Sequence, residues 1–327
     1  MNKKLRADLL LLGVTLIWGA SFTVMKNALE FIPPFAYLGI RFSIAAVILA
    51  IIYRKRIKEI RMPAVKGGTV VGLLICAYMF LQVVGLQYTT ASKSALITGI
   101  SVVLVPVFSA FILKKVPDVF SILGVALAMS GLLFLAELRG FNLNFGDLLT
   151  LGCAVLCAIH ILSVDHFTMK FDPKIISLLQ FAVCAVLYLT GWIVTGFQSF
   201  VINTQVVLAL LITGVFGTAV AYTVWAIVQQ DTTPTKVALI FTCEPVFGVV
   251  LALIIPRNDG TTEKMTINML LGCVLIVAGM ILAELKPKKS KLKKMKLKKI
   301  SRQITDLTKP EIAANEKTGS IQKASGE

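Results

Sequence analysis

Long apolar runs recur along the chain as far as residue 285. About 20 apolar residues in an α-helix cross the roughly 30 Å hydrocarbon core of a bilayer. The runs lack the strict alternation that is typical of membrane β-strands. Hydrophobic residues make up 57% of the chain and charged residues 15%, whereas soluble domains average about 45–50% and about 25%. The sequence therefore predicts an all-α integral membrane protein.

We expect ten transmembrane helices, because in a bilayer each segment must satisfy its own backbone hydrogen bonds. The first run is long enough to span, so we interpret it as an uncleaved helix and not as a signal peptide. The predicted helices lie near residues 7–26, 35–53, 67–87, 92–113, 119–138, 146–166, 174–196, 205–229, 236–256 and 267–285. An even number of spans places both termini on one side of the membrane.

The basic residues of the connecting segments indicate which side that is. With cytoplasmic termini, fourteen Lys and Arg lie in the inner segments before the tail and five lie in the outer segments. This asymmetry follows the positive-inside rule. We therefore expect cytoplasmic termini in a multi-pass protein of the cell membrane, and the short loops favour a bacterial inner membrane.

The C-terminal segment differs sharply from the rest of the chain. Residues 286–302 contain ten Lys or Arg, and residues 286–327 carry thirteen basic and four acidic side chains, so +9 of the net +16 lies there. This distribution indicates a basic tail and not a nucleic-acid-binding fold. The tail either binds anionic lipid head groups or is a solvated orientation signal. Its last 25 residues have the composition of a disordered segment.

The chain contains an internal repeat. At an offset of 139 residues, Asp8 matches Asp147, and the segment 106–108 matches 245–247. At an offset of 143 residues, the segment 87–97 matches 230–240, including the two threonines that follow the glutamine in each copy. Each copy holds five predicted spans, and an odd number makes the second copy cross the membrane upside down. Inverted repeats are typical of secondary transporters, whose substrate site lies between the repeats.

The repeat divides the chain into three parts. We expect a first five-helix repeat in residues 1–140, a second inverted repeat in residues 141–286, and the basic cytoplasmic tail in residues 287–327. The loops between spans are short, so little of the chain lies outside the membrane.

Several motifs in these runs resemble the drug/metabolite transporter superfamily and its EamA-like ten-helix branch. They lie in residues 17–22, 39–42, 86–95, 105–106, 238–240, 244–247, 271–272 and 278–279. The family usually has a Gly-Glu-Arg-like turn after the fourth and ninth helices, whereas this chain has Lys-Lys-Val-Pro at 114–117 and Pro-Arg-Asn-Asp at 256–259. The resemblance implies a secondary active or facilitative transporter that exports small organic metabolites, such as amino acids, by alternating access.

Few charged residues lie deep within the predicted spans, where ionisable groups are costly and often functional, and Arg41 and Glu244 are the two candidates. Arg41 could pair with a substrate carboxylate, or it could reach outward or pair with a neighbouring helix end. Glu244 could bind a cationic group or carry a proton, or it could bind backbone groups that Pro245 leaves free.

Pro106 and Pro245 each remove a helix hydrogen bond, and we expect them to kink their helices at equivalent points near the cavity. Trp18, Tyr78, Gln82, Tyr222 and Trp225 are candidate cavity residues, because a mostly apolar site needs a few polar contacts to orient a ligand. Ordinary helix packing is the alternative for each of them. Six glycines are expected to let neighbouring helices approach closely: Gly72, Gly85, Gly99, Gly214, Gly217 and Gly248.

Cys153, Cys157 and His160 share one face of a predicted helix and could supply three ligands to a soft metal. No second Cys/His helix completes such a site, so we expect no metal, and the cysteines are interpreted as apolar packing residues. Asp165 and His166 lie at the cytoplasmic end of this helix and are expected to face water.

The sequence lacks the motifs of the main alternatives. It has no phosphate-binding GxxxxGK[ST] loop, no GxSxG and no HExxH, so we expect no ATP hydrolysis, no enzymatic activity and no cofactor. A membrane enzyme would need clustered Asp, Glu or His at one interface. A sensor or scaffold acting through the basic tail remains a separate possibility. The expected partner is a small molecule, and the protein could be a monomer or a homodimer.

Overall fold

The computed structural model describes residues 3–89, 91–112, 114, 117–135, 144–254 and 265–284. Within these ranges the chain forms helices and turns and contains no strand. The helices are α1 (Lys3–Ala28), α2 (Pro34–Ile52), α3 (Arg54–Ile57), α4 (Met62–Tyr88), α5 (Ala91–Gly99), α6 (Ser101–Ile112), α7 (Val119–Leu135), α8 (Phe145–Thr168), α9 (Pro173–Val194), α10 (Thr204–Leu211), η1 (Ile212–Val220), α11 (Ala221–Val228), η2 (Gln229–Asp231), α12 (Pro234–Phe241), α13 (Cys243–Ile254) and α14 (Ile267–Glu284).

Eight helical segments of the described chain are long and apolar enough to cross a membrane. The shorter helices α7 and α14 are also apolar. An all-helical, multi-pass membrane protein is therefore confirmed. Crossing by all ten predicted helices stays a prediction, as does the side on which the termini lie.

Local sequence signals explain where several helices begin. Proline occupies the first turn of α2, α4, α9 and α12, where its missing N–H is not needed. At the start of α8, the Asn144 side chain accepts a hydrogen bond from the Asp147 amide at 2.9 Å. The Asp147 carboxylate in turn accepts one from the Asn144 amide at 2.8 Å, which completes a capping box.

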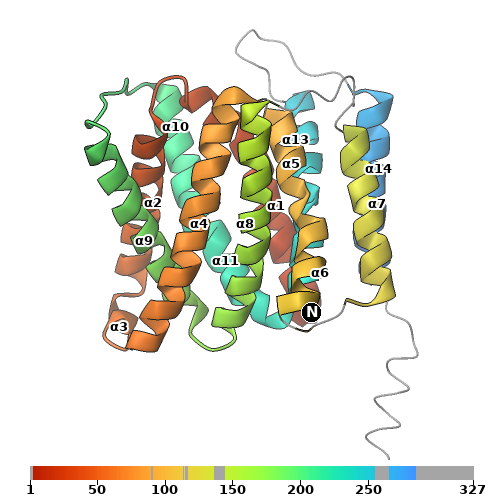
Figure 1. Ribbon diagram of the computed structural model, residues 1–327, viewed down its shortest axis with the longest axis horizontal. Helices are drawn as coiled ribbons and strands as arrows, with labels where there is room; N and C mark the ends of the chain where they lie inside the picture. Colours follow the sequence, from red (N-terminus) through yellow and green to blue (C-terminus); the bar gives the residue numbers. More distant parts are fainter. Residues whose placement is uncertain are drawn as a thin grey trace, which may run out of the picture. The chain divides into compact units, whose positions relative to one another are not determined.

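The helices pack along contacts that small residues permit. Helix α4 lies against α8 and α9, α2 lies against α9, and α7 lies beside α14 (Figure 1). The contact between α7 and α14 is reciprocal. A Cβ added to Gly124 would lie 2.5 Å from the Gly279 carbonyl oxygen, and one added to Gly131 would lie 2.6 Å from that of Gly272.

The predicted close approaches are confirmed at some glycines only. A Cβ on Gly72 or Gly85 would come within 2.9 Å of a neighbouring helix. On Gly99 it would meet the Leu132 side chain at 2.8 Å. Gly214, Gly217 and Gly248 have more space, because their nearest neighbours lie at 3.4 to 3.8 Å.

Three predicted spans are not single α-helices. The predicted helix 92–113 is interrupted at Ile100, and the predicted helix 236–256 is interrupted at Thr242. The predicted helix 205–229 contains the nine-residue π-helix η1. A π-helix bonds residue i to residue i+5 and often occurs at functional sites.

The interruptions lie before the two prolines at which kinks are expected, and the kinks themselves stay a prediction. Ile100 lies six residues before Pro106, and Thr242 lies three residues before Pro245. A proline ring crowds the carbonyl of residue i−4, which is Phe241 for Pro245. This crowding accounts for the interruption at Thr242 and not for the one at Ile100. The two interruptions fall within one residue of equivalent positions, because the 143-residue offset pairs Ile100 with Cys243, the residue after Thr242.

Candidate functional site

A cavity lies between the helices at the centre of the bundle. Eight of the nine predicted site residues line it: Trp18, Arg41, Tyr78, Gln82, Tyr222, Trp225, Glu244 and Pro245. Pro106 is not among its lining residues and is buried inside α6. The structure thus brings together residues from both halves of the sequence, although whether they bind a substrate stays a prediction.

The cavity is small. Its volume is about 70 Å³, whereas an engineered cavity that holds benzene has a volume of about 150 Å³. A ligand of metabolite size would therefore require neighbouring helices or side chains to move apart.

Aromatic rings form one wall of the cavity. The Trp18 ring lies 4.8 Å from the Tyr222 ring and 4.9 Å from the Phe241 ring, measured between centroids. The Trp18 Nε1–H donates a hydrogen bond to the Gly217 carbonyl of η1 at 2.8 Å, which fixes the orientation of the indole. Aromatic walls bury apolar ligand surface and also attract cations to their faces.

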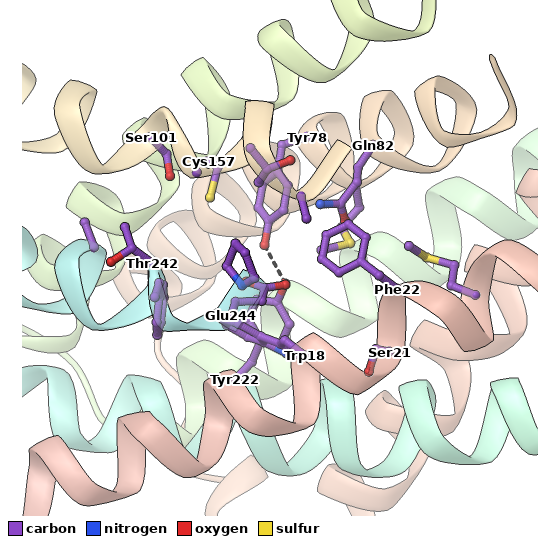
Figure 2. Close-up of a pocket in the computed structure, with 18 of the residues that line it drawn as sticks. Trp18, Ser21, Phe22, Tyr78, Gln82, Ser101, Cys157, Tyr222, Thr242 and Glu244 are labelled. Carbon is purple, nitrogen blue, oxygen red and sulfur yellow. Dashed lines mark hydrogen bonds between the residues drawn. The ribbon is translucent and has the colours of Figure 1, made fainter. Parts of the chain in front are cut away.

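Two tyrosines meet across the cavity. Tyr78 reaches from α4 to Tyr222 of α11, and their hydroxyl oxygens lie 2.6 Å apart (Figure 2). Gln82 follows Tyr78 one turn along α4, is 6% exposed and lines the same space. The Gln82 amide makes no hydrogen bond with any described residue, so its donors and acceptor are available to a ligand.

Arg41 is buried in the cavity wall. It is 3% exposed, and its Nε donates a hydrogen bond to Thr218 Oγ1 of η1 at 2.8 Å. Its Nη1 lies 4.0 Å from the Met25 sulfur. Within the described part of the chain, no carboxylate forms an ion pair with Arg41. The alternative that Arg41 reaches outward is therefore wrong, and part of its guanidinium lacks a charged partner.

The π-helix positions the acceptor for Arg41. In η1 the Thr218 hydroxyl donates to the Thr213 carbonyl, five residues earlier, at 2.7 Å. The Thr213 hydroxyl lies 2.8 Å from the Tyr37 hydroxyl of α2. The wide turns of η1 thus place both threonines against α2, which holds Arg41 beside the cavity.

Glu244 lies in the first turn of α13, directly after the interruption at Thr242. Its side chain lines the cavity, and no described residue forms a hydrogen bond or ion pair with its carboxylate. The alternative that it binds backbone groups freed by Pro245 is not seen among these residues. Arg41 and Glu244 therefore give one cavity an available cation and an available carboxylate.

The candidate metal ligands do not form a metal site. Cys157 lines the cavity, Cys153 is buried, and His160 Nε2 lies 3.2 Å from Gln180 Oε1. The described residues contain no cluster of three or more His, Cys, Asp or Glu that could hold a metal ion.

A buried chain of polar residues that begins at the cavity residue Trp225 was not expected. Trp225 Nε1–H donates to Gln229 Oε1 at 2.7 Å, and Gln229 Nε2–H donates to Asp165 Oδ1 at 3.2 Å. Asp165 is only 4% exposed, so the prediction that it faces water is wrong. His166 is exposed, as predicted. The i, i+4 spacing of Trp225 and Gln229 was a sequence signal for the hydrogen bond between these two residues.

Comparisons with known proteins identify one matching family model and several similar chains. The model of the EamA-like transporter family matches the chain twice, at residues 5–136 and 144–285. An uncharacterized transporter of Archaeoglobus fulgidus is 33% identical over 289 residues, which cover 87% of each chain. The uncharacterized transporter YvbV of Bacillus subtilis is 28% identical, over 88% of this chain and 94% of YvbV.

Two further similarities extend the comparison. Protein PagO of Salmonella typhimurium is 25% identical over 262 residues, which cover 76% of this chain and 84% of PagO. A solved crystal structure superposes with a TM-score of 0.71 at 19% identity, over 85% of this chain and 96% of that chain. At this identity the structural similarity supports the fold alone.

Proposed function

The chain belongs to the EamA-like transporter family, and we propose that it exports small organic metabolites such as amino acids by alternating access. It is a multi-pass membrane transporter and not an enzyme. Beyond membership of the family, we propose the substrate class, the direction of transport and the mechanism. The protein would act as either a secondary active or a facilitative transporter. The proposed location is a bacterial inner membrane.

We propose that ten helices form two inverted repeats, in residues 1–140 and 141–286, with both termini in the cytoplasm. The double match of the family model supports this division. The reciprocal glycine contacts of α7 and α14 also support it, because a two-fold axis between two equivalent helices would produce such a pattern. The tail, residues 287–327, lies outside the described residues, and its binding to anionic lipid stays a proposal, as does a monomeric or homodimeric state.

The proposed substrate class rests on one observation. Arg41 and Glu244 line the same cavity, and neither forms an ion pair with another residue that the structure describes. A buried charge is costly unless it is paired. A substrate with one carboxylate and one ammonium group would pair both side chains and would itself have no net charge. The aromatic wall around Trp18 would cover the apolar part of such a zwitterion.

Glu244 also offers a reason for export. One carboxylate cannot pair with a substrate ammonium and hold a proton in the same position at the same time. Competition between the two would couple proton entry to substrate exit. An exterior more acidic than the cytoplasm would then drive substrate out as long as the proton gradient exceeds the opposing substrate gradient.

The test compares three chemically matched compounds in liposomes that contain the full-length protein. These are a labelled neutral amino acid, the amine that lacks its carboxylate and the acid that lacks its amino group. We expect saturable efflux of the amino acid and at least tenfold slower efflux of the other two. Equal efflux of all three would contradict the zwitterion class, whereas saturable efflux of any compound would still support a transporter.

Substitution of the surface residue Lys58 by Gln provides a matched control for charge removal. Lys58 is exposed and lies between α3 and α4, away from the cavity. The variant Lys58→Gln should keep the order of the three efflux rates. Deleting residues 286–327 should also leave the efflux intact, because no part of the proposed substrate site lies in the tail.

A further inference from the structure

We propose that two threonine–aspartate pairs, Thr89–Asp147 and Thr232–Asp8, are latches that close opposite faces of the bundle in turn. The inference rests on the proposed alternating-access function and adds the side chains that hold each face shut.

The internal repeat relates the two pairs. Asp8 and Asp147 match at the 139-residue offset, and Thr89 and Thr232 match at the 143-residue offset. Asp8 lies near the start of α1, and Asp147 lies in the first turn of α8. Each threonine lies just before α5 or α12, the helices that end at the two interruptions.

The two pairs lie at opposite faces. Lys26, near the end of α1, donates hydrogen bonds to the carbonyl oxygens of Leu86 and Thr89 at 2.6 and 3.0 Å. The end of α1 therefore lies at the same face as the Thr89–Asp147 pair, and the start of α1 lies at the other (Figure 1). We call the face where α1 starts the terminal face and the other the distal face.

At the distal face the latch is closed. Thr89 Oγ1 donates a hydrogen bond to Asp147 Oδ1 at 2.7 Å, and both residues are buried. The helices it joins are in close contact, since a Cβ on Gly85 of α4 would lie 2.9 Å from the Gly146 carbonyl oxygen of α8. The hydrogen bonds from Lys26 hold α1 against the same end of α4.

At the terminal face the equivalent hydrogen bond is missing. Asp8 Oδ2 accepts a hydrogen bond from Lys236 Nζ at 2.7 Å. However, Asp8 Oδ1 and Thr232 Oγ1 are both buried and have no hydrogen-bond partner among the described residues. Helix α1 packs against η2 and α12, the two elements that flank Thr232. An unpaired donor and an unpaired acceptor thus lie on neighbouring segments, at the positions that are bonded at the distal face.

Buried polar atoms without partners are rare and call for a specific explanation. A second conformation provides one, in which Thr232 donates to Asp8 while Thr89 separates from Asp147. The exchange breaks one hydrogen bond and forms another of the same kind. The two conformations would then be close in free energy, so that a ligand or a proton could shift the balance between them.

Labelling of a cavity cysteine tests the proposal without any substrate. Cys157 lines the cavity and is kept as the single cysteine of the full-length protein. A membrane-impermeant maleimide is applied to one face of vesicles of known orientation. The measured quantity is the ratio of the distal labelling rate to the terminal labelling rate.

Removing one hydroxyl should shift this ratio in opposite directions at the two sites. Thr89→Val frees the distal latch and should raise the ratio by roughly three- to tenfold, the effect of one hydrogen bond. Thr232→Val removes the bond of the other conformation and should lower the ratio by a similar factor. Thr89→Ser and Thr232→Ser keep a hydroxyl and should match the parent protein.

The double variant Thr89→Val/Thr232→Val should return the ratio close to the parent value, since both conformations then lose one bond. Shifts in the same direction, or no shift in either well-folded single variant, would overturn the proposal. If one valine variant does not fold, the other still tests the proposal, because a change of its labelling ratio in the direction opposite to the predicted one would contradict the latches. Opposite shifts in a protein without amino acid efflux would support the latches and reject only the substrate class.

Discussion

The hydroxyl oxygens of Tyr78 and Tyr222 lie 2.6 Å apart and join α4 to α11 across the cavity. One tyrosine donates to the other, so one of the two O–H groups remains available to a ligand. Tyr78 lies in the third predicted span and Tyr222 in the eighth, which are equivalent in the proposed repeats. The hydrogen bond therefore lies where two inverted halves of a transporter would meet.

Removing either tyrosine hydroxyl should weaken the link between the halves. Tyr78→Phe and Tyr222→Phe each remove the same hydrogen bond, whose net contribution to stability is about 1 kcal/mol. Because both single variants lose the same bond, the double variant should lose about 1 kcal/mol less stability than the sum of the two single losses. Thermal unfolding of the four purified proteins measures this coupling, and strictly additive losses would show that the bond contributes nothing.

Arg41 should set the affinity for the substrate carboxylate. Hydrogen bonds to charged groups contribute about 1.5–3 kcal/mol, and each 1.4 kcal/mol is about a tenfold change in affinity. We therefore expect Arg41→Gln to raise the KM for a neutral amino acid by roughly 10- to 100-fold. Efflux of the matched amine, which has no carboxylate, serves as the control and should change little. An equal loss for both compounds would mean that Arg41 only supports the fold through Thr218.

Glu244 should carry the response to a pH gradient. Glutamine resembles a protonated carboxyl group that cannot release its proton, so Glu244→Gln should abolish acceleration of efflux by an acidic exterior. Glu244→Asp keeps a carboxylate and should retain part of the response. Efflux rates with and without the gradient measure the effect, and an unchanged response in Glu244→Gln would remove Glu244 from the coupling step.

The contact between α7 and α14 should tolerate no added methyl group. A Cβ on Gly131 would lie 2.6 Å from the Gly272 carbonyl oxygen, whereas one on Gly13 of α1 would meet nothing within 4 Å. Overpacking typically costs about 1–3 kcal/mol. We expect Gly131→Ala to lower the apparent melting temperature and Gly13→Ala to leave it unchanged or raised, because alanine favours helix. Equal melting temperatures would contradict the tight packing of this pair.

The sequence predicted the membrane-spanning helices well, because hydropathy and length dominate their formation. It also predicted eight of the twenty residues that line the cavity, including Arg41 and Glu244, because charged residues deep inside apolar spans are rare enough to identify. The interruption at Thr242 was missed because the effect of a proline spreads over the turn before it. The one at Ile100 lies six residues before Pro106, too far for the same explanation.

The π-helix and the Asp165–Gln229 bond were not predicted for a different reason. Both depend on which helices become neighbours, and a hydropathy pattern carries no such information. Thr213 and Thr218, five residues apart in a glycine-containing segment, are the only local signal for η1. Asp165 lies near the end of its helix. At such a position the sequence does not distinguish a side chain exposed to water from one that contacts a neighbouring helix.

Counterflow in liposomes that contain the full-length protein is the most direct test of the central claim. The vesicles are loaded with an unlabelled neutral amino acid and diluted into a trace of the labelled compound. A carrier that alternates its access should accumulate label transiently above the equilibrium level and then release it. Monotonic equilibration would indicate a channel, and no entry of label in folded protein would contradict transport of this class of substrate.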